Sequence, residues 1–154
     1  MTHTPRPGEP APATAPRARV ILDNDYGGDP DGLFQLAHHL LSPSVRVDLI
    51  IASKIPDSFA ESDPGAGARG VVAADRVLEL LGRPERAVVG VETGLVPGVV
   101  PPLTDAARAI IREALRDDPL PLVYCAGGGL TDLATACLHE PRVAELVNLV
   151  WIGG

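Results

Sequence analysis

Four aspartates lie within nine residues of one another and are the first side chains in the sequence that could do chemistry. They belong to the segment DNDYGGDPD, residues 23–31, which we call the acidic turn. Carboxylates this close repel one another, and a hard divalent cation removes that cost. Ca²⁺ takes about six to eight oxygen ligands, whereas Mg²⁺ takes fewer protein ligands and more water. The acidic turn is therefore a candidate metal site made from Asp23, Asp25, Asp29 and Asp31.

A simpler interpretation explains only part of this turn. Asp29 and Asp31 could cap a following helix, where carboxylates are stabilised by the positive end of the helix dipole. That role would leave Asp23 and Asp25 unexplained. An EF-hand is excluded, because Phe34 stands at the loop position where a bidentate Glu is needed.

A second segment of interest is the run of three glycines, residues 127–129, which follows an apolar stretch. These glycines could simply form a tight turn between a strand and a helix. They could also bring backbone groups, such as the carbonyl of Gly127, against a ligand or a metal ion. We expect Thr131 to cap the helix that follows.

The hydrophobic pattern predicts strands that alternate with helices. The predicted strands are residues 20–22, 45–52, 87–91, 120–126 and 148–152, and the predicted helices are residues 31–41, 68–81, 104–116, 131–138 and 141–146. Such alternation is typical of an α/β fold with an open, mostly parallel sheet covered by helices on both faces. Ligands of these sheets bind outside the carboxyl ends of the strands. The acidic turn and the triple glycine both follow strands, so they could meet there.

The domain organisation follows from composition. Residues 1–17 are rich in Pro, Ala and Thr and are predicted to be a disordered tail, while residues 18–154 are predicted to form the α/β domain. Trp151 lies in the last apolar strand, and we expect it in the core. With no covering element after it, that strand would leave apolar surface bare, which favours association and a homo-oligomer.

Charge and cysteine usage narrow the functional classes. The net charge of −7 argues against sequence-independent binding of nucleic acid and against an anionic membrane surface. No apolar run is long enough for a membrane span, and the N-terminus has no secretory h-region. Cys125 and Cys137 sit in apolar runs without metal-ligand spacing, which favours a reducing, cytoplasmic compartment.

Two blocks of sequence resemble the nucleoside hydrolase family, the inosine- and uridine-preferring nucleoside N-ribohydrolases. The first is VILDNDYGGDPDGLFQLAHHLL, residues 20–41, because the family's first strand ends in Asp-x-Asp-x-Gly followed by an acidic pair. The second is LVYCAGGGLTDLATACLHEPRVAELVNLVWIGG, residues 122–154, which is similar to the family's strand, glycine turn, Leu-Thr-Asn helix and strand ending in Met-Gly-Gly. The resemblance covers residues 19–154 and corresponds to the N-terminal half of the family's domain.

The resemblance implies a Ca²⁺ site, with Mg²⁺ as the alternative ion, below a ribose pocket. It implies that Asp25 is the base that takes a proton from a metal-bound water. The implied metal ligands are Asp23, Asp25, Asp29, Asp31 and the backbone carbonyl of Gly127, and the implied sugar contacts are Asp23, Asn24 and Asp29. The expected reaction is hydrolysis of the N-glycosidic bond of a nucleoside or related riboside, a small-molecule reaction of purine or pyrimidine salvage.

Three departures from the family bear on this expectation. The family's acidic pair is contiguous, whereas here Pro30 separates Asp29 from Asp31. The family's Gly-Asn after the second strand is replaced by the residues from Ser53 to Asp57. The chain is also about half the family's length, so the family's additional metal-binding Asp and the His that helps expel the base have no counterpart.

Two other functions are compatible with these residues. The chain could be a non-catalytic metal- or ribose-binding domain, or a truncated half that associates with another chain. It could also be a Mg²⁺-dependent phosphatase of the haloacid dehalogenase type, in which Asp23 would be the nucleophile. That family, however, expects Thr or Val where Gly27 stands and a Lys late in the chain, and the only lysine here is Lys54.

Overall fold

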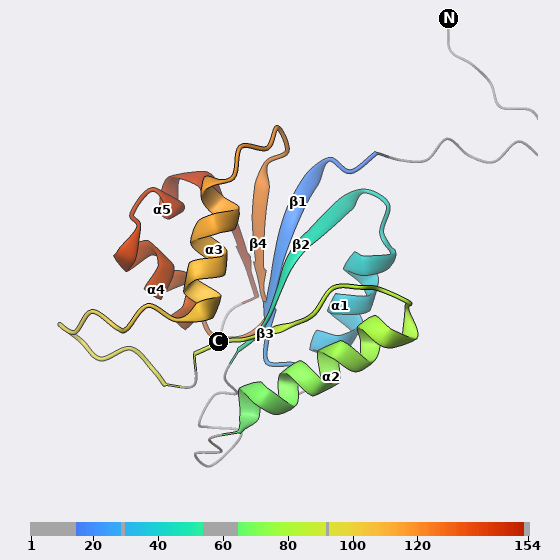
Figure 1. Cartoon of the computed structure of the whole chain (residues 1–154), viewed down its shortest axis with the longest axis horizontal. Coiled ribbons are helices and arrows are strands. Elements are labelled where there is room, and N and C mark those ends of the chain that lie inside the picture. Colours follow the sequence, from blue (N-terminus) through green and yellow to red (C-terminus); the bar gives the residue numbers. More distant parts are fainter. Residues whose placement is uncertain (1–14, 29, 54–64, 92, 153–154) are drawn as a thin grey trace, which may run out of the picture.

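The computed structural model describes residues 15–28, 30–53, 65–91 and 93–152. Most of the predicted tail, and Asp29 of the acidic turn, lie outside the described residues. Strands and helices alternate as the sequence pattern predicts (Figure 1). The elements are β1 (Ala18–Asn24), α1 (Asp31–Leu41), β2 (Val45–Ala52), α2 (Ala66–Leu80), β3 (Val88–Val89), α3 (Asp105–Leu115), β4 (Leu122–Ala126), α4 (Thr131–His139), α5 (Val143–Leu146) and β5 (Val147–Trp151).

The five strands form one sheet in the order β3-β2-β1-β4-β5, and all of its neighbouring strands are parallel. β1 is the central strand, and its last residues pair with the last residues of both neighbours. Asp23 lies opposite Ile51 of β2 and Ala126 of β4. The carboxyl ends of β2, β1 and β4 therefore meet at one edge of the sheet.

Helices cover both faces of the sheet, which confirms the predicted α/β class. α1 and α2 lie on one face, and α3, α4 and α5 lie on the other (Figure 1). Side chains of β1 alternate between these two layers, as the pleat of a strand requires. Val20 and Leu22 pack in the cluster with α1 and α2, whereas Ile21 packs in the cluster with α3 and α4. Asp23, two residues after Ile21, therefore emerges on the α3 side.

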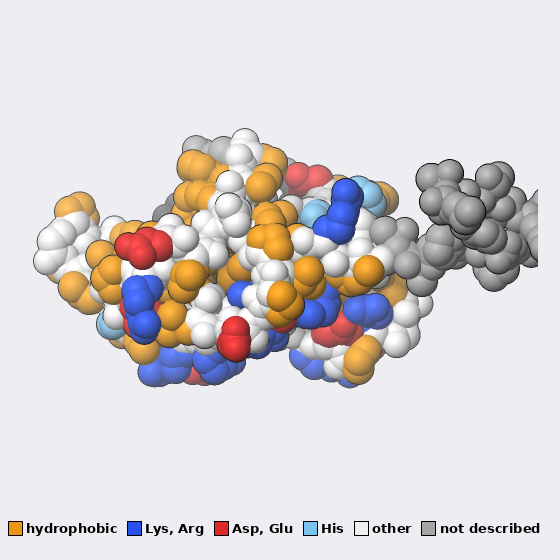
Figure 2. Space-filling view, turned by 90° about the horizontal axis from the view of Figure 1, so that it is seen from above, with side chains coloured by type: hydrophobic (Ala, Val, Ile, Leu, Met, Phe, Trp, Pro, Cys, Tyr) orange, Lys and Arg blue, Asp and Glu red, His pale blue; other side chains and the backbone are white. Residues whose placement is uncertain are grey.

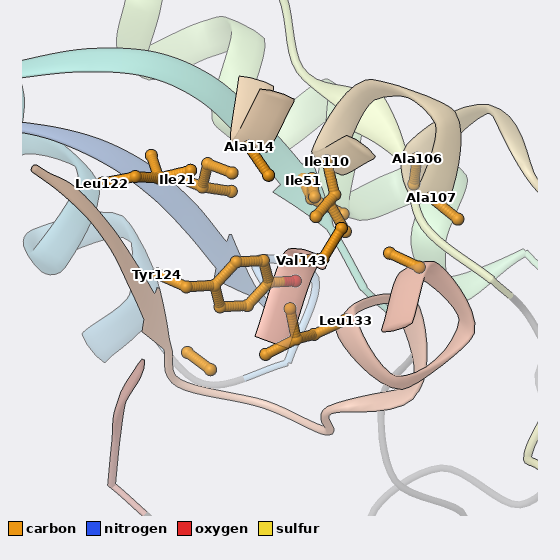
Figure 3. Close-up of a cluster of buried hydrophobic side chains, with 12 residues drawn as sticks. Ile21, Ile51, Ala106, Ala107, Ile110, Ala114, Leu122, Tyr124, Leu133 and Val143 are labelled. Carbon is orange, nitrogen blue, oxygen red and sulfur yellow. The ribbon is translucent and has the colours of Figure 1, made fainter. Parts of the chain in front are cut away.

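The core on the α3 side contains a buried tyrosine, Tyr124, among aliphatic side chains (Figure 3). Its ring lies between residues of the sheet and residues of α4 and α5, near Leu133 and Val143. The core on the other face contains a second fully buried tyrosine, Tyr26, from the acidic turn. Each face of the sheet thus contributes one buried phenol close to its carboxyl edge.

At the amino ends of the strands, acidic side chains are paired with arginines. Arg46 bonds to both Asp48, at 2.8 Å, and Asp118, and Arg116 bonds to the same two carboxylates. Figure 2 views the molecule from this side and shows basic and acidic side chains next to one another. The backbone N–H of Leu120 and the Arg46 guanidinium lower the pKa of Asp118. The amino edge therefore carries carboxylates whose charge is compensated.

Some local predictions were confirmed and others were wrong. Thr104 caps α3 by accepting a hydrogen bond from the backbone N–H of Ala107, at 3.1 Å. Thr131 does not cap α4, because Leu130 occupies the cap position and Thr131 is already helical. Trp151 is not a core residue, because β5 is the edge strand and the side chain is 43% exposed.

Within the described ranges, no helix is long and apolar enough to cross a membrane.

Candidate functional site

The acidic turn and the three glycines of residues 127–129, which we call the glycine turn, meet at the carboxyl edge of the sheet, as predicted. The backbone N–H of Gly127 donates to the carbonyl oxygen of Asp23, at 2.9 Å. A Cβ at Gly127 would lie only 2.2 Å from Nδ2 of Asn24. A residue with a side chain would therefore push Asn24 away, and this close approach explains why glycine stands there.

Asp23 is the most deeply placed carboxylate of the site. It is fully buried, and its Oδ2 accepts a hydrogen bond from the hydroxyl of Tyr124. Its Oδ1 is buried and has no hydrogen-bond partner among the described residues. Burial is the main cause that raises the pKa of Asp23 to about 7; the negative charges of Asp132 and Asp25 act in the same direction, and the hydroxyls of Tyr124 and Ser53 act against it. Among the described residues no cation contributes to this pKa, and an added cation would favour the ionised form.

Asp25 follows at the mouth of the same turn and is partly exposed. Its carbonyl oxygen accepts the backbone N–H of Gly28, at 2.7 Å, which closes the turn. A Cβ at Gly28 would lie 3.1 Å from Oδ2 of Asp25. The turn thus places a partly exposed carboxylate beside the buried carboxylate of Asp23.

Asn24 uses its side chain to brace the turn against α1. Its Oδ1 accepts the backbone N–H of Asp25, at 2.9 Å, and its Nδ2 donates to Oε1 of Gln35, at 2.8 Å. A Cβ at Gly32 would lie 2.9 Å from Cγ of Asn24, so the first turn of α1 packs directly on this amide. The predicted sugar contact of Asn24 stays a prediction, and its observed role is structural.

Asp31 lies in the first turn of α1 and is exposed. Its Oδ1 accepts the backbone N–H of Gly32, at 2.8 Å, and the residue at the cap position is Pro30, which makes no side-chain cap bond. This contact supports a helix-end role for Asp31. The predicted ligand Asp29 lies outside the described residues.

The fit to a metal ion can be judged from these donors. Among the residues that the structure describes, no group of three or more His, Cys, Asp or Glu side chains could hold a metal ion. The two carboxylates that lie near one another at the turn, Asp23 and Asp25, offer oxygen donors, whereas the Gly127 backbone contact seen here is made by its N–H. Oxygen donors suit Ca²⁺ or Mg²⁺ rather than a softer metal, and the unpartnered Oδ1 of Asp23 is an orphaned acceptor of the required kind.

Three polar residues of the edge were not singled out as site residues from the sequence. Ser53 follows β2 and is 5% exposed, Asp132 lies in the first turn of α4 and is 1% exposed, and Tyr124 lies within β4. Asp132 accepts the backbone N–H of Val91 with both carboxylate oxygens, at 3.0 and 3.1 Å. A Cβ at Gly90 would lie 2.5 Å from Oδ2 of Asp132. Asp132 therefore ties the loop after β3 to α4.

A signal in the sequence could have found two of these three residues. Ser53 and Asp132 both follow strands directly or through the glycine turn, so the rule that ligands bind at carboxyl ends would have selected them. Tyr124 gives no such signal, because it lies inside an apolar run and its hydroxyl could have had any buried partner.

Comparison with known proteins shows which fold this is. No protein-family model and no curated protein sequence matches the chain. A solved plant nucleoside hydrolase is similar, with a TM-score of 0.68 and 22% identity over 90% of this chain and 48% of that one. The inosine-uridine preferring nucleoside hydrolase of Bacillus anthracis gives a TM-score of 0.66 and 20% identity, over 89% and 50%. The purine-preferring ribonucleoside hydrolase of Gardnerella vaginalis gives 0.60 and 22%, over 88% and 48%.

The chain spans about half the length of these solved structures. At such low identity the likeness concerns the fold and not the chemistry. The resemblance seen in the sequence is therefore confirmed at the level of structure: the chain has the α/β fold of about half of a nucleoside hydrolase.

Proposed function

We propose that this chain carries the catalytic carboxylates of an N-ribohydrolase, which cleaves the N-glycosidic bond of nucleosides or related ribosides. The observation that carries the proposal is the pair formed by buried Asp23 and partly exposed Asp25 at the carboxyl end of β1. The pair lies against the glycine turn after β4. Its position is where open α/β sheets bind ligands, in a fold shared with nucleoside hydrolases.

In this proposal Asp25 is the general base. A water oxygen forms a bond to the anomeric carbon while the bond from that carbon to the base nitrogen breaks. The proton of the water passes to Asp25, and the leaving base gains its proton from solvent or from an acid supplied by another part of the enzyme. One carboxylate that activates water on the face opposite the leaving group is the arrangement of inverting glycoside hydrolysis.

The proposed cofactor is Ca²⁺, with Mg²⁺ as the alternative. A bound divalent cation would lower the pKa of a water molecule and fix its position. Asp23, Asp25 and the Gly127 carbonyl would hold it, together with Asp29. Asp31 could join only by giving up its hydrogen bond to Gly32. Asp23, Asn24 and Asp29 are the proposed sugar contacts.

The proposed substrate is a small nucleoside, and neither nucleic acid nor a membrane is a proposed partner. Cys125 and Cys137 are both free thiols, which supports a reducing compartment such as the cytoplasm.

The test is a hydrolysis assay on a panel of purine and pyrimidine nucleosides, with and without chelator. We expect base release that requires a divalent cation and is lost in Asp25→Asn. Asp118→Asn, at the opposite edge of the sheet, is the matched control and should keep the activity. Hydrolysis that survives in Asp25→Asn would refute the role of this residue.

A second candidate is supported by a separate observation. Leu149, Val150 and Trp151 of the edge strand are between 43% and 55% exposed, and the chain covers about half of its structural relatives. A chain of this kind could bind metal or riboside without hydrolysis, or associate with another polypeptide, and the predicted homo-oligomer stays a prediction. Riboside binding without turnover would favour this candidate. The phosphatase alternative gains no support, because its nucleophile would be Asp23, which is fully buried.

A further inference from the structure

The glycine turn is held between the two strands that flank β4. On one side, the backbone N–H of Gly127 donates to the carbonyl oxygen of Asp23 in β1, at 2.9 Å. On the other side, the indole N–H of Trp151 in β5 donates to the carbonyl oxygen of Gly128, at 2.9 Å. Three consecutive glycines have unusual conformational freedom, so contacts from outside the turn are needed to fix its path.

The strand register brings the indole to this carbonyl. Trp151 lies opposite Ala126, the last residue of β4, and the glycine turn begins at the next residue. Gly128 is buried, and a buried carbonyl that loses its hydrogen-bond partner destabilises the position of the chain around it. The indole therefore satisfies a carbonyl that would otherwise favour a different path of the turn.

Trp151 differs in this respect from its neighbours on the edge strand. Trp151, Leu149 and Val150 have similar exposure, at 43%, 45% and 55%. Leu149 and Trp151 lie on the same side of β5, because side chains alternate along a strand. Leu149 is aliphatic and has no polar group to offer the turn. Trp151 thus makes a specific polar contact from a position where core packing does not require a large side chain.

Gly128 lies directly against the acidic turn. A Cβ at Gly128 would lie 3.4 Å from the backbone nitrogen of Asp25 and 3.7 Å from the Cβ of Asp25. A shift of the glycine turn would therefore change the space next to Asp25. Gly128 is thus the residue that connects the indole of Trp151 with the carboxylate-bearing residue at the mouth of the site.

We propose that Trp151 is a positioning residue of the candidate site, which holds the glycine turn against Asp25 through its bond to the Gly128 carbonyl. Trp151 itself contacts neither the substrate nor the metal ion. It restricts the glycine turn, and the glycine turn restricts the position of Asp25. The role of Asp25 in this inference rests on the proposed function.

Amide hydrogen exchange, followed by NMR on the full chain, tests whether Trp151 holds the turn. The backbone N–H of Gly127 donates to Asp23 at the carboxyl edge, and the backbone N–H of Arg19 donates to the carbonyl oxygen of Pro121 at the amino edge, at 3.1 Å. Trp151→Phe keeps an apolar ring but removes the donor. In this variant we expect exchange to become roughly fivefold faster at Gly127 and to stay unchanged at Arg19.

Comparison of the two amides separates positioning from a general loss of stability. Leu149→Ala is the matched control, because it removes a similarly exposed side chain from the same side of β5, and both amides should exchange as in the wild type. If Trp151→Phe were only less stable, exchange at Gly127 and Arg19 would become faster by the same factor, which would overturn the proposal. Unchanged exchange at Gly127 in Trp151→Phe would overturn it as well.

Fluorescence of the wild type gives a second measurement, which needs no variant. Trp151 is the only tryptophan in the chain, so the emission reports on the indole beside Gly128. Because the glycine turn lies against Asp25, Ca²⁺ that binds at the acidic turn should change this emission, with the same midpoint as in calorimetry. Calorimetric binding without a change in emission would contradict the connection between the indole and the site.

Hydrolysis distinguishes this inference from the proposed function. In a wild type that releases base, Trp151→Phe should lower kcat by up to about 10²-fold, with a smaller change in KM, while Leu149→Ala should keep the wild-type rate. An unchanged kcat in Trp151→Phe would overturn the positioning of Asp25. No hydrolysis by the wild type, together with selectively faster exchange at Gly127 in Trp151→Phe, would contradict the hydrolase and support the hold of Trp151 on the turn.

Discussion

The two edges of the sheet treat their carboxylates in opposite ways. At the amino edge, Asp48 and Asp118 are each bonded to both Arg46 and Arg116, and the pKa of Asp118 is lowered. At the carboxyl edge, Asp23 is fully buried, no cation from the described part of the chain offsets its charge, and its pKa is raised to about 7.

This contrast separates a structural use of charge from a functional one. Paired carboxylates at the amino edge stabilise the fold a little and require nothing else. A buried carboxylate without a cation costs stability and is retained where a ligand or a reaction uses it. The carboxyl edge is therefore the part of the molecule where chemistry should be sought, and each prediction below tests one side of the contrast.

The largest effect is expected at Asp25, the partly exposed carboxylate of the carboxyl edge. Replacing a general base lowers the rate by about 10²- to 10⁴-fold, so Asp25→Asn should lower nucleoside hydrolysis by a factor in this range. Initial rates of base release at saturating nucleoside measure it. The variant should unfold at the same temperature as the wild type, and a rate within a factor of two of the wild type would remove Asp25 from the mechanism.

The next effect concerns Asp23 and the pH dependence of stability. In the unfolded chain this carboxyl ionises near pH 3.8, whereas in the folded protein its pKa is about 7. As pH rises between these values, the unfolded state releases the proton and the folded state keeps it, so stability falls. One pKa unit corresponds to about 1.4 kcal/mol, which gives a loss of roughly 4 kcal/mol by pH 8.

Urea unfolding of the wild type and Asp23→Asn, at pH 5 and pH 8 in chelator, measures this loss. The asparagine cannot ionise, so the variant should gain stability over the wild type at pH 8 and gain much less at pH 5. A constant difference at both pH values would show that Asp23 does not carry the raised pKa.

A smaller effect is expected from the backbone contact between the two turns. In Gly127→Ala the new methyl group would meet the Asn24 amide at 2.2 Å and displace it from Asp25 and Gln35. Overpacking of this kind costs about 1–3 kcal/mol. Gly129→Ala is the control, because its Cβ would meet nothing nearer than 3.9 Å. Equal thermal stability of the two variants would contradict the close approach.

The smallest effect is expected at the amino edge. The pKa of Asp118 is lowered by the backbone N–H of Leu120 and by Arg46, so its ionised form stabilises the fold above the unfolded pKa. Asp118→Asn should therefore lose a little stability at pH 7, and the difference should vanish as the pH falls through the carboxyl range. This pH dependence is opposite in sign to that of Asp23. A change in nucleoside hydrolysis in this variant would break the distinction between the edges.

Much of the fold could be predicted from the sequence because the pattern is local. Helix α1 was predicted with its observed bounds, residues 31–41, since its apolar face and the Ser-Pro that stops it are adjacent in the chain. β3 was predicted over residues 87–91 but covers only Val88–Val89. It pairs with β2 alone, at the edge of the sheet, and such a limit depends on neighbours that a local pattern does not contain.

The site was predictable only where it lies within one segment. Asp23 and Asp25 are recognisable because their spacing is local, and the glycine turn because it follows a strand. The contact between Tyr124 and Asp23 depends on the register of β1 with β4, and the position of Ser53 depends on the register of β1 with β2. The sequence can mark Ser53 as a residue that follows a strand, but it does not show which residues of neighbouring strands meet.

The most direct test of the contrast between the two edges is calorimetric titration of the folded chain with Ca²⁺, beside Asp25→Asn and Asp118→Asn. The account predicts binding with a dissociation constant of about 10⁻⁴ M or tighter, lost in Asp25→Asn and unchanged in Asp118→Asn. Absence of binding by the folded wild type, or equal binding by Asp25→Asn, would contradict the assignment of the carboxyl edge as a metal-dependent site.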